Sequence, residues 1–448
     1  MRPGDTFVAR SGRWAYSGLF YLAVPLIVIR FWLKGRRLPG YRSRLGERFG
    51  LGPPALARAR VVIHCVSVGE VRGARGLIEA LAQSMPEYQL LVTTTTPTGA
   101  EQVRQLQSMV DLEGRLEHAY LPLDLPDAMA RFLSRYRPTA IILIETELWP
   151  NLITAAWRRK IPVVVANARL SERSFRRYQR VVRLVEPVVG RLHRVYAVAD
   201  ADAARFTLLG VQGPRIRVCG NLKFDVRLAP TRPRARPPRR IWMAVSTHRG
   251  EEVIALKAHR RLCALEGALL VLAPRHPERV EEVAQAAARA GVRMQRRTGL
   301  ADSAMAHWWE LDTDCLVVDT LGELGRFFPK AQVAVMGGSL VPVGGHNPLE
   351  AAAHGVALLT GPHVWNFAEI FDRLGQVGAL VRLAVDGSDV DANAAILSET
   401  VDRLLGATDE RAAMAEAGLG LIASSRGATN CIVEAVLADL ADLTPVAK

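Results

Sequence analysis

Short apolar segments rich in β-branched residues alternate with amphipathic stretches along most of the 448-residue chain. Such alternation is typical of parallel strands joined by crossover helices. The strand-like segments come in two sets: VVIHCV, LLVTTT, AIILIE, PVVVAN and RVYAVAD before residue 229, and IWMAVS, ALLVLAP, CLVVDT, AQVAVMGG and ALLTGP after residue 240. Residues 229–240, APTRPRARPPRR, are too rich in proline and arginine for a helix or a central strand. We therefore predict two doubly wound α/β domains, at 51–228 and 241–448, joined by a linker at 229–240, with a helical tail (CIVEAVLADLADL) in the second domain.

An apolar segment precedes these domains. Residues 14–29 read WAYSGLFYLAVPLIVI, and a basic flank follows them at Lys34, Arg36, Arg37, Arg42, Arg44 and Arg48. A bilayer core of about 30 Å needs roughly 20 apolar helical residues, so this segment crosses it only by tilting or by thinning the lipid. No small-residue cleavage site follows, and the basic flank favours the cytoplasmic side. We expect residues 1–50 to form a signal anchor or an interfacial helix with the body of the protein in the cytoplasm, a core helix of the first domain being the alternative.

Basic residues outnumber acidic ones, since 58 Lys and Arg against 44 Asp and Glu leave a net charge of +14. This charge indicates an anionic partner: nucleic acid, an acidic membrane surface or a phosphorylated substrate. With 49% hydrophobic and 23% charged residues, the composition excludes a disordered or fibrous chain.

The five cysteines stand far apart, with no CxxC pair and no histidine spaced to complete a zinc site. We expect all of them to be small buried side chains in a reducing compartment. They are Cys65, Cys219, Cys263, Cys315 and Cys431.

Charged and polar residues follow the strand-like segments of the first domain, where ligands of doubly wound sheets bind. Glu70 of SVGE can serve as a general base, or can simply satisfy the dipole of the helix that starts there. The threonine-rich run at 93–99 suits an oxyanion, or caps the next helix. Glu145 ends an unbroken apolar segment, where a carboxylate is costly unless it is paired or functional. Lys223 of GNLKFD lies beside the linker, at the expected hinge between the domains.

The second domain repeats this arrangement. Arg275 of APRHPER is the best candidate phosphate ligand of the chain, with an ordinary surface arginine as the alternative. The run GGHNPLE combines paired glycines, which allow a ligand to approach the backbone, with Pro348 at a helix start. Glu350 lies where a carboxylate can accept hydrogen bonds from ribose hydroxyls.

The ordered blocks of the chain resemble those of the 3-deoxy-D-manno-octulosonate (Kdo) transferases of lipopolysaccharide biosynthesis. The resemblance covers nearly the whole chain and rests on the N-terminal hydrophobic helix with YRSRLGERFG, and on SVGE, TTTTPTG, ETELWPN, NARLS, GNLKFD, APRHPER, DTLGEL and GGSLVPVGGHNPLEAAAHG. It implies a GT-B glycosyltransferase, with two Rossmann-like domains facing a cleft and an N-terminal membrane-anchor helix at the cytoplasmic face of the inner membrane. The implied donor is CMP-Kdo, and the implied acceptor is the tetraacyl disaccharide bisphosphate precursor of lipid A, lipid IVA.

The same resemblance implies roles for individual residues. It makes Glu70 the general base of an inverting transfer, and Glu145 and Lys223 the groups that stabilise the transition state. It assigns the CMP contacts to Pro274, Arg275, Leu321, Gly322, Glu323, Asn347, Pro348, Leu349 and Glu350. We expect no cofactor and no metal, because the Asp-x-Asp spacings at 200–202, 312–314 and 389–391 lie outside the nucleotide-binding turns.

Two other functions remain open. Another GT-B nucleotide-sugar enzyme, such as a UDP-sugar transferase or epimerase, would share the glycine-rich second domain. A basic, membrane-associated protein that binds nucleic acid or anionic lipid would also explain the charge, although not the carboxylates and glycines at the strand ends. We therefore expect no nucleic-acid partner.

Overall fold

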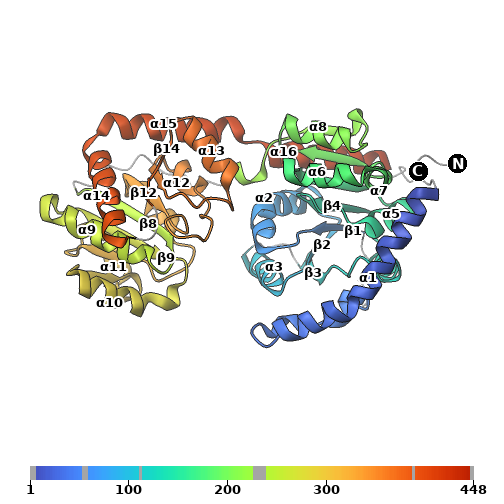
Figure 1. The fold of residues 1–448 in the computed structure, drawn as a ribbon, viewed down its shortest axis with the longest axis horizontal. Coiled ribbons are helices and arrows are strands. Elements are labelled where there is room, and N and C mark those ends of the chain that lie inside the picture. Colours follow the sequence, from blue (N-terminus) through green and yellow to red (C-terminus); the bar gives the residue numbers. More distant parts are fainter. Residues whose placement is uncertain (1–6, 53–58, 110–113, 226–238, 386–388, 444–448) are drawn as a thin grey trace. The chain divides into compact units, whose positions relative to one another are not determined.

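The computed structural model describes residues 7–52, 59–109, 114–225, 239–385 and 389–443. The chain forms two compact units. The N-terminal unit combines Met1–Asp225 with Ser425–Lys448, and the C-terminal unit is Val226–Ser424. Each unit is an α/β fold around a seven-stranded sheet (Figure 1), so the predicted two-domain α/β architecture is confirmed.

The sheet of the N-terminal unit has the order β3-β2-β1-β4-β5-β6-β7, and its strands pair in parallel. The strand order reverses between β1 and β4. At such a switch point, the loops after the two strands run to opposite faces of the sheet and leave a crevice in which ligands bind. The strands are β1 (Arg60–His64), β2 (Gln89–Thr94), β3 (Leu116–Tyr120), β4 (Ala140–Ile144), β5 (Val163–Ala168), β6 (Arg194–Ala197) and β7 (Ile216–Val218).

Alternate residues of these strands enter two separate cores, because successive side chains of a strand point to opposite faces. Val61 and Ile63 pack under α2, α3 and α16 on one face, and Val62 packs under α4 and α5 on the other. The helices of this unit are α1 (Phe7–Lys34), α2 (Val68–Ser84), α3 (Pro97–Met109), α4 (Pro126–Tyr136), α5 (Pro150–Arg158), α6 (Glu172–Arg180), α7 (Val182–Val189), α8 (Asp200–Leu208) and α16 (Ala428–Leu443). The short 3₁₀ turns η1 (Pro39–Tyr41) and η2 (Leu45–Phe49) follow α1, and η4 (Leu222–Phe224) precedes the linker.

The sheet of the C-terminal unit repeats the pattern, in the order β10-β11-β9-β8-β12-β13-β14, with its reversal between β8 and β12. Its strands are β8 (Ile241–Thr247), β9 (Leu269–Pro274), β10 (Met294–Arg296), β11 (Cys315–Val317), β12 (Val333–Met336), β13 (Ala357–Thr360) and β14 (Leu380–Arg382). Its helices are α9 (Glu251–Glu266), α10 (Val280–Ala290), α11 (Asp302–Met305), α12 (Leu349–Ala353), α13 (Ala368–Gln376), α14 (Val390–Gly406) and α15 (Thr408–Ser425).

The ten strand-like segments of the sequence all form strands, but four further strands were not predicted. They are β3, β7, β10 and β14, which are the two outermost strands of each sheet. Three of them, β7, β10 and β14, are only partly buried along their length, so they lack the continuous apolar run of a central strand.

Most of the predicted linker, residues 229–238, lies outside the described residues. Arg239 already belongs to the C-terminal unit, because its guanidinium donates hydrogen bonds to the carbonyls of Gly267, Ala268, Leu311 and Thr313 at 2.7–3.2 Å. The described part of the C-terminal unit therefore begins at Arg239, just before β8.

The helical tail, which we predicted to belong to the second domain, packs on the N-terminal unit instead. α16 lies against α2 and adds Ile432, Val436 and Leu440 to the core on that face of the sheet. The carboxylate of Asp225 accepts hydrogen bonds from the Gly427 and Thr429 amides at 2.7 and 2.6 Å, at the start of α16. The amphipathic pattern of the tail indicated a helix but did not indicate which sheet it would cover.

The prediction for the cysteines is wrong at two positions. Cys219, after β7, and Cys431, on α16, form a disulfide across a separation of 212 residues. Cys65 and Cys315 are free and buried, as predicted. The reducing compartment was inferred from isolated cysteines, so the disulfide removes that support.

We expect Asp439→Ala to loosen α16. The buried Tyr196 hydroxyl donates to Asp439 at 2.6 Å, and leaving it without an acceptor should cost about 1–3 kcal/mol of stability. Hydrogen exchange on the full chain should then speed up in α16 and remain unchanged in β8–β13. Glu434→Ala, at an exposed position of the same helix, is the matched control. Equal protection of α16 in the two variants would contradict this role for Asp439.

Candidate functional site

Glu70 lies in the first turn of α2, directly after β1. Its carboxylate turns back toward the strand and accepts hydrogen bonds from the Val66 amide at 2.6 Å and the Ser67 hydroxyl at 3.1 Å. Ser67 is the N-cap residue of α2, so these bonds resemble a capping box. Glu70 thus lies in the first turn of α2, where its alternative role at the helix dipole requires it, and the two bonds hold its carboxylate in one position.

The environment of Glu70 makes its carboxylate unusually basic. Burial raises its pKa to about 7, and the negative charges of Glu145 and Glu147 act in the same direction. The bonds from Val66 and Ser67 stabilise the ionised form and oppose this rise. The carboxylate of Glu70 is therefore better suited to take up a proton than an ordinary glutamate.

Glu145 and Lys223 form an ion pair at the same edge of the sheet. The Lys223 ammonium lies 3.1 Å from Oε1 of Glu145. Lys223 belongs to η4, whose backbone is held by hydrogen bonds from the Leu222 amide to Asn167 and from the Lys223 amide to Asn221, both at 3.0 Å. A β-carbon on Gly73 of α2 would stand 3.7 Å from Cε of Lys223, so α2 and the lysine are adjacent. The three predicted residues thus gather where β1 and β4 end.

Backbone strain marks this edge. Glu145 and Asn167 both adopt left-handed conformations, with φ of 62° and 53°. Such values are uncommon for residues other than glycine and persist where the surroundings impose them, often at functional sites. Ser246, at the end of β8 in the C-terminal unit, has a φ of 57°. Asparagine is enriched in this conformation, but the residue types at Glu145 and Ser246 give no such signal.

The threonine-rich run is largely engaged in local hydrogen bonds. Thr93 pairs with His64 at 2.9 Å, Thr94 with His118 at 2.9 Å, and Thr95 with the Val66 carbonyl at 3.0 Å. Thr96 accepts a hydrogen bond from the Gly99 amide in the first turn of α3. These contacts favour the capping interpretation of the run over an anion site.

In the C-terminal unit, the predicted nucleotide residues follow β9, β11 and β12 at one edge of the sheet. Pro274 is the last residue of β9, and the Arg275 amide donates to the Thr247 carbonyl at 2.9 Å. Leu321, Gly322 and Glu323 form a turn after β11, in which Leu321 is 73% exposed. The Glu350 carboxylate lies beside Gly325, and so joins this turn to the segment Asn347, Pro348, Leu349 and Glu350 after β12.

The expected phosphate-binding helix after GGHNPLE is short. α12 has five residues and Pro348 as its N-cap, and Asn347, one residue earlier, accepts a hydrogen bond from the Leu349 amide at 3.1 Å. A helix of one turn contributes little dipole, so the glycine-rich turn before it is the more important feature.

Glu251 was not singled out from the sequence, although it holds the glycine-rich turn in place. It is 1% exposed and accepts four backbone hydrogen bonds, at 2.7–3.0 Å, from His248, Gly338, Ser339 and Leu340. A β-carbon on Gly337 would stand 2.4 Å from the Ser246 carbonyl oxygen, so glycine is required at this close approach. In the sequence, Glu251 is a glutamate in the first turn of the helix that follows β8. Acidic residues are common at that position, so this pattern did not distinguish Glu251 from others.

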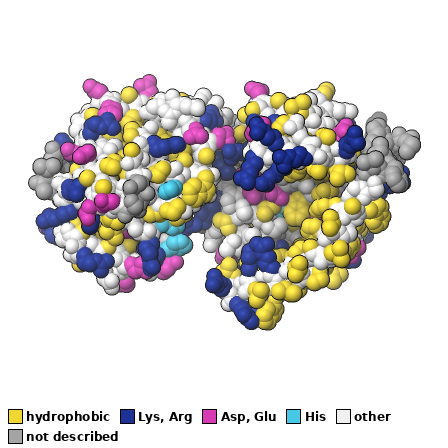
Figure 2. All heavy atoms as spheres, viewed as in Figure 1, with side chains coloured by type: hydrophobic (Ala, Val, Ile, Leu, Met, Phe, Trp, Pro, Cys, Tyr) yellow, Lys and Arg dark blue, Asp and Glu magenta, His cyan; other side chains and the backbone are white. Residues whose placement is uncertain are grey.

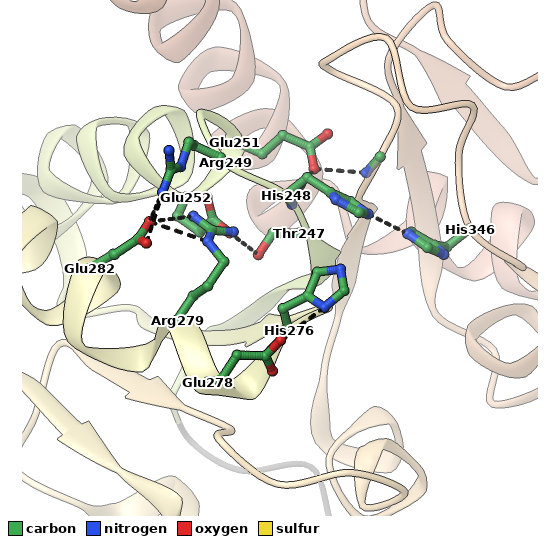
Figure 3. Close-up of polar contacts among 11 residues, drawn as sticks. Thr247, His248, Arg249, Glu251, Glu252, His276, Glu278, Arg279, Glu282 and His346 are labelled. Atoms are coloured by element: carbon green, nitrogen blue, oxygen red, sulfur yellow. Dashed lines mark hydrogen bonds and ion pairs between the residues drawn. The ribbon is translucent and has the colours of Figure 1, made fainter. Parts of the chain in front are cut away.

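Three histidines gather at this edge (Figure 3). His248 and His346 stack with their Nε2 atoms 2.9 Å apart, and His276 meets His248 edge to face at a ring distance of 5.8 Å. One of these two imidazoles donates the hydrogen bond and the other accepts it, so the accepting ring is neutral. Burial, followed by the charges of His276, Arg275 and Arg279, lowers the pKa of His248.

Nearby charged residues serve the fold. Arg279 bridges Glu252 at 2.9 Å and Glu282 at 3.2 Å, and Arg249 binds the same Glu282 at 2.8 Å, which ties α9 to α10. Among the described residues, the guanidinium of Arg275 has no hydrogen-bond or ion-pair partner.

The Asp-x-Asp spacings also have structural uses. Asp202 accepts a hydrogen bond from the Leu170 amide. Asp314 forms an ion pair with Arg293. Asp389 is the N-cap of α14, and Asp391 forms an ion pair with Lys257. Within the described ranges, no group of three His, Cys, Asp or Glu side chains is arranged to hold a metal ion.

Comparison with known proteins shows likeness over nearly the whole chain. Residues 43–226 match the family model described as 3-Deoxy-D-manno-octulosonic-acid transferase (kdotransferase). The 3-deoxy-D-manno-octulosonic acid transferase of Haemophilus influenzae is 35% identical over 94% of this chain and 97% of its own length. The Bordetella pertussis protein of the same name is 34% identical over 95% and 99%. Among solved structures, a putative UDP-N-acetylglucosamine 2-epimerase from Listeria monocytogenes aligns with a TM-score of 0.53 and 14% identity, over 86% of this chain and 98% of that one, which confirms the GT-B fold alone.

The raised pKa of Glu70 predicts a pH-dependent stability difference. The folded state favours the protonated carboxyl, so this contribution is complete below the ordinary pKa of 4.5 and is lost as the pH rises through about 7. Glu70→Gln cannot ionise and should lose less stability over that range than the natural protein. Thermal unfolding of both proteins across this pH window tests the prediction. A difference in Tm that does not change with pH would show that Glu70 titrates normally.

Proposed function

The chain belongs to the 3-deoxy-D-manno-octulosonic acid transferase family, and on that premise we propose that this glycosyltransferase moves Kdo from CMP-Kdo to a hydroxyl of lipid IVA with inversion. The observation that carries the proposal is the cluster of Glu70, Glu145 and Lys223 at the end of β1 and β4. It combines a basic carboxylate with a neighbouring ion pair at the edge where doubly wound sheets bind ligands.

Glu70 is the general base of this reaction. An acceptor hydroxyl is a weak nucleophile until a base takes its proton as it attacks. In the proposed step, the proton moves to the Glu70 carboxylate and the hydroxyl oxygen bonds to the anomeric carbon. The bond from that carbon to the CMP phosphate breaks, and CMP leaves with the electron pair. Attack opposite the leaving group inverts the anomeric centre, so one carboxylate suffices.

The negative charge on the departing phosphate needs fixed positive partners. Arg275 is suited to this role because arginine binds phosphate oxygens through paired N–H groups. We assign charge stabilisation also to Lys223, whose ion pair with Glu145 keeps it fixed before the reaction begins. In this account Glu145 positions Lys223 and contributes to the basicity of Glu70.

The donor nucleotide would be held by three segments of the C-terminal unit. They are 274–275, 321–323 and 347–350, and all follow strands of one sheet edge. The glycine-rich turn held by Glu251 gives the donor access to the backbone. We propose no cofactor or metal, since the Asp-x-Asp carboxylates already serve as caps and ion-pair partners.

The substrates place the reaction at a membrane. Lipid IVA is held in a bilayer and CMP-Kdo is a soluble nucleotide sugar, so we propose that the active site faces the cytoplasm at the surface of the inner membrane. The net charge of +14 and the apolar helix α1 support this location.

We expect Glu70→Gln to lower the transfer rate by about 10²- to 10⁴-fold, the usual contribution of a general base. Binding of CMP should be unchanged, because the predicted nucleotide residues belong to the other unit. Mass spectrometry of the lipid product after incubation with CMP-Kdo measures transfer, and calorimetry measures CMP binding. Glu87→Gln, at an exposed position of the same unit, serves as the control. Turnover within tenfold of the control would rule out Glu70 as the base.

Arg275→Gln is expected to weaken CMP binding by about 10- to 100-fold, because a hydrogen bond to a charged group contributes about 1.5–3 kcal/mol. Arg249→Gln is a suitable control, since that guanidinium is also near the edge but pairs with Glu282. Calorimetric titration with CMP compares the two variants. Equal affinities would exclude Arg275 from the nucleotide site.

A further inference from the structure

α1 has two faces with different surroundings. Its inner face is partly or fully buried at intervals of three and four residues, at Arg13, Tyr16, Ser17, Phe20, Val24, Ile27 and Phe31. This spacing is that of a helix packed lengthwise against a body. The opposite face carries large exposed apolar side chains at Trp14, Leu19, Leu22, Leu26, Ile29, Trp32 and Leu33, with exposures of 50–78%. We call these seven residues the outer strip.

Specific polar contacts hold the inner face to the N-terminal unit. Ser17 is 2% exposed and accepts a hydrogen bond from the Asn151 side chain at 3.1 Å. The Tyr21 hydroxyl donates to Asp127 at 2.5 Å. A β-carbon on Gly12 would stand 2.1 Å from Leu184 of α7, so α1 approaches α7 closely there. These contacts extend over more than two helical turns.

The other end of α1 is held as well. The Arg42 guanidinium donates two hydrogen bonds of 3.0 Å to the Trp32 carbonyl. The Phe31 ring stacks on Tyr41 at 5.8 Å, and Arg48 lies 5.2 Å from the centre of the Phe31 ring. The helix is therefore attached to the unit from Gly12 to Trp32.

Crossing a bilayer would break these contacts. α1 is long and apolar enough to span, because an 18-residue window within Arg10–Lys34 has a mean hydropathy of 1.6. However, a spanning helix would carry Ser17 and Tyr21 into hydrocarbon and leave Asn151 and Asp127 without these partners. The same helix cannot pack lengthwise on the unit and also cross the membrane.

The outer strip and the charges around it match an anionic membrane surface. Figure 2 shows hydrophobic side chains along α1 with Lys and Arg at its lower end. Trp14 and Trp32 stand near the two ends of the strip, where membrane-interface helices commonly carry tryptophan. Exposed basic residues lie near the two ends of the strip at Arg10, Lys34, Arg36, Arg37 and Arg42. Further exposed arginines lie on α7, which contacts α1, and on α6, which contacts α7: Arg173, Arg176, Arg177, Arg180 and Arg183. A continuous apolar strip on a soluble surface is unusual, and basic flanks favour anionic lipid as its partner.

We infer that α1 lies in the plane of the headgroup region of an anionic membrane, with the outer strip inserted in the lipid and the inner face remaining on the protein. The chain then binds one leaflet and does not span. A helix of 28 residues is about 42 Å long, so the strip gives an extended line of attachment parallel to the surface.

This orientation has a consequence for the acceptor, which rests on the proposed function. Ser17 bonds to Asn151 in the first turn of α5, which follows β4 and Glu145. A β-carbon on Gly40, after α1, would stand 2.7 Å from Cβ of Pro97 at the start of α3. α1 and its extension therefore lie along the loops at the carboxyl edge of the sheet. A flat α1 brings that edge to the headgroups, where the sugar hydroxyls of lipid IVA lie.

The first experiment measures binding of the full chain to vesicles that contain phosphatidylglycerol. The double variant Leu22→Glu/Leu26→Glu should bind at least tenfold more weakly, because two charges enter the strip. Leu208→Glu, at a 64% exposed leucine of α8, is the matched control and should bind like the natural protein. Equal binding of all three proteins would overturn the inference. So would a change of oligomeric state of the double variant without vesicles, since it would make the strip a contact between two copies.

A measurement of insertion depth distinguishes a helix that lies in the membrane surface from one that spans the bilayer. A fluorophore attached at Ala15→Cys, Leu22→Cys or Ile29→Cys should be quenched best by shallow lipid quenchers at all three positions, about 5–10 Å below the surface. The same labelling reaction on the natural protein corrects for its own cysteines. A spanning helix would place position 22 near the bilayer centre and the other two toward opposite leaflets, and this result would overturn the inference.

Activity measurements keep this inference distinct from the proposed function. The double variant should transfer Kdo normally to acceptor dispersed in detergent and poorly to acceptor in vesicles. Loss of transfer in both settings would contradict the docking role of the strip. Absence of transfer by the natural protein would refute the proposed function and leave the vesicle and depth results valid.

Discussion

A wholly parallel sheet places a strict constraint on this protein, because both of its faces must be covered by the helices that return the chain from one edge to the other. The loops that follow the carboxyl ends of neighbouring strands therefore lie side by side. In the N-terminal unit this brings together Glu70, Glu145 and Lys223, which are far apart in sequence. In the C-terminal unit it brings together Arg275, His248 and His346. The chemistry of both edges follows from this gathering.

The buried carboxylates of the two units differ in their hydrogen-bond partners. Glu251 receives four backbone hydrogen bonds and acts as a rigid clamp for the glycine-rich turn. Burial, and then the nearby carboxylates, raise the pKa of Glu70 against the opposing effect of its two hydrogen bonds. The first arrangement suits a structural anchor, since its acceptor capacity is filled. The second suits a group that must exchange a proton.

The sequence predicted the central strands and the positions of the candidate site, and the physical reasons are clear. Strands such as β1 and β8 are buried on both faces and appear as continuous apolar runs, whereas the partly exposed outer strands β7 and β10 have no such run. Charged residues directly after a central strand could therefore be located. The left-handed backbone of Glu145 and the Cys219–Cys431 pairing depend on tertiary contacts between distant segments, which local patterns do not record.

The return of α16 to the N-terminal unit affects how the chain can be made. Residues near 430–440 complete a core that begins at Val61, so that core remains open while the ribosome synthesises everything in between. The described strands of the C-terminal unit all end by Arg382, so its sheet does not depend on α16. During that interval the apolar face of α2 is exposed to chaperones and to other nascent chains. Removal of α16 would therefore lower the stability of the N-terminal unit more than that of the C-terminal unit.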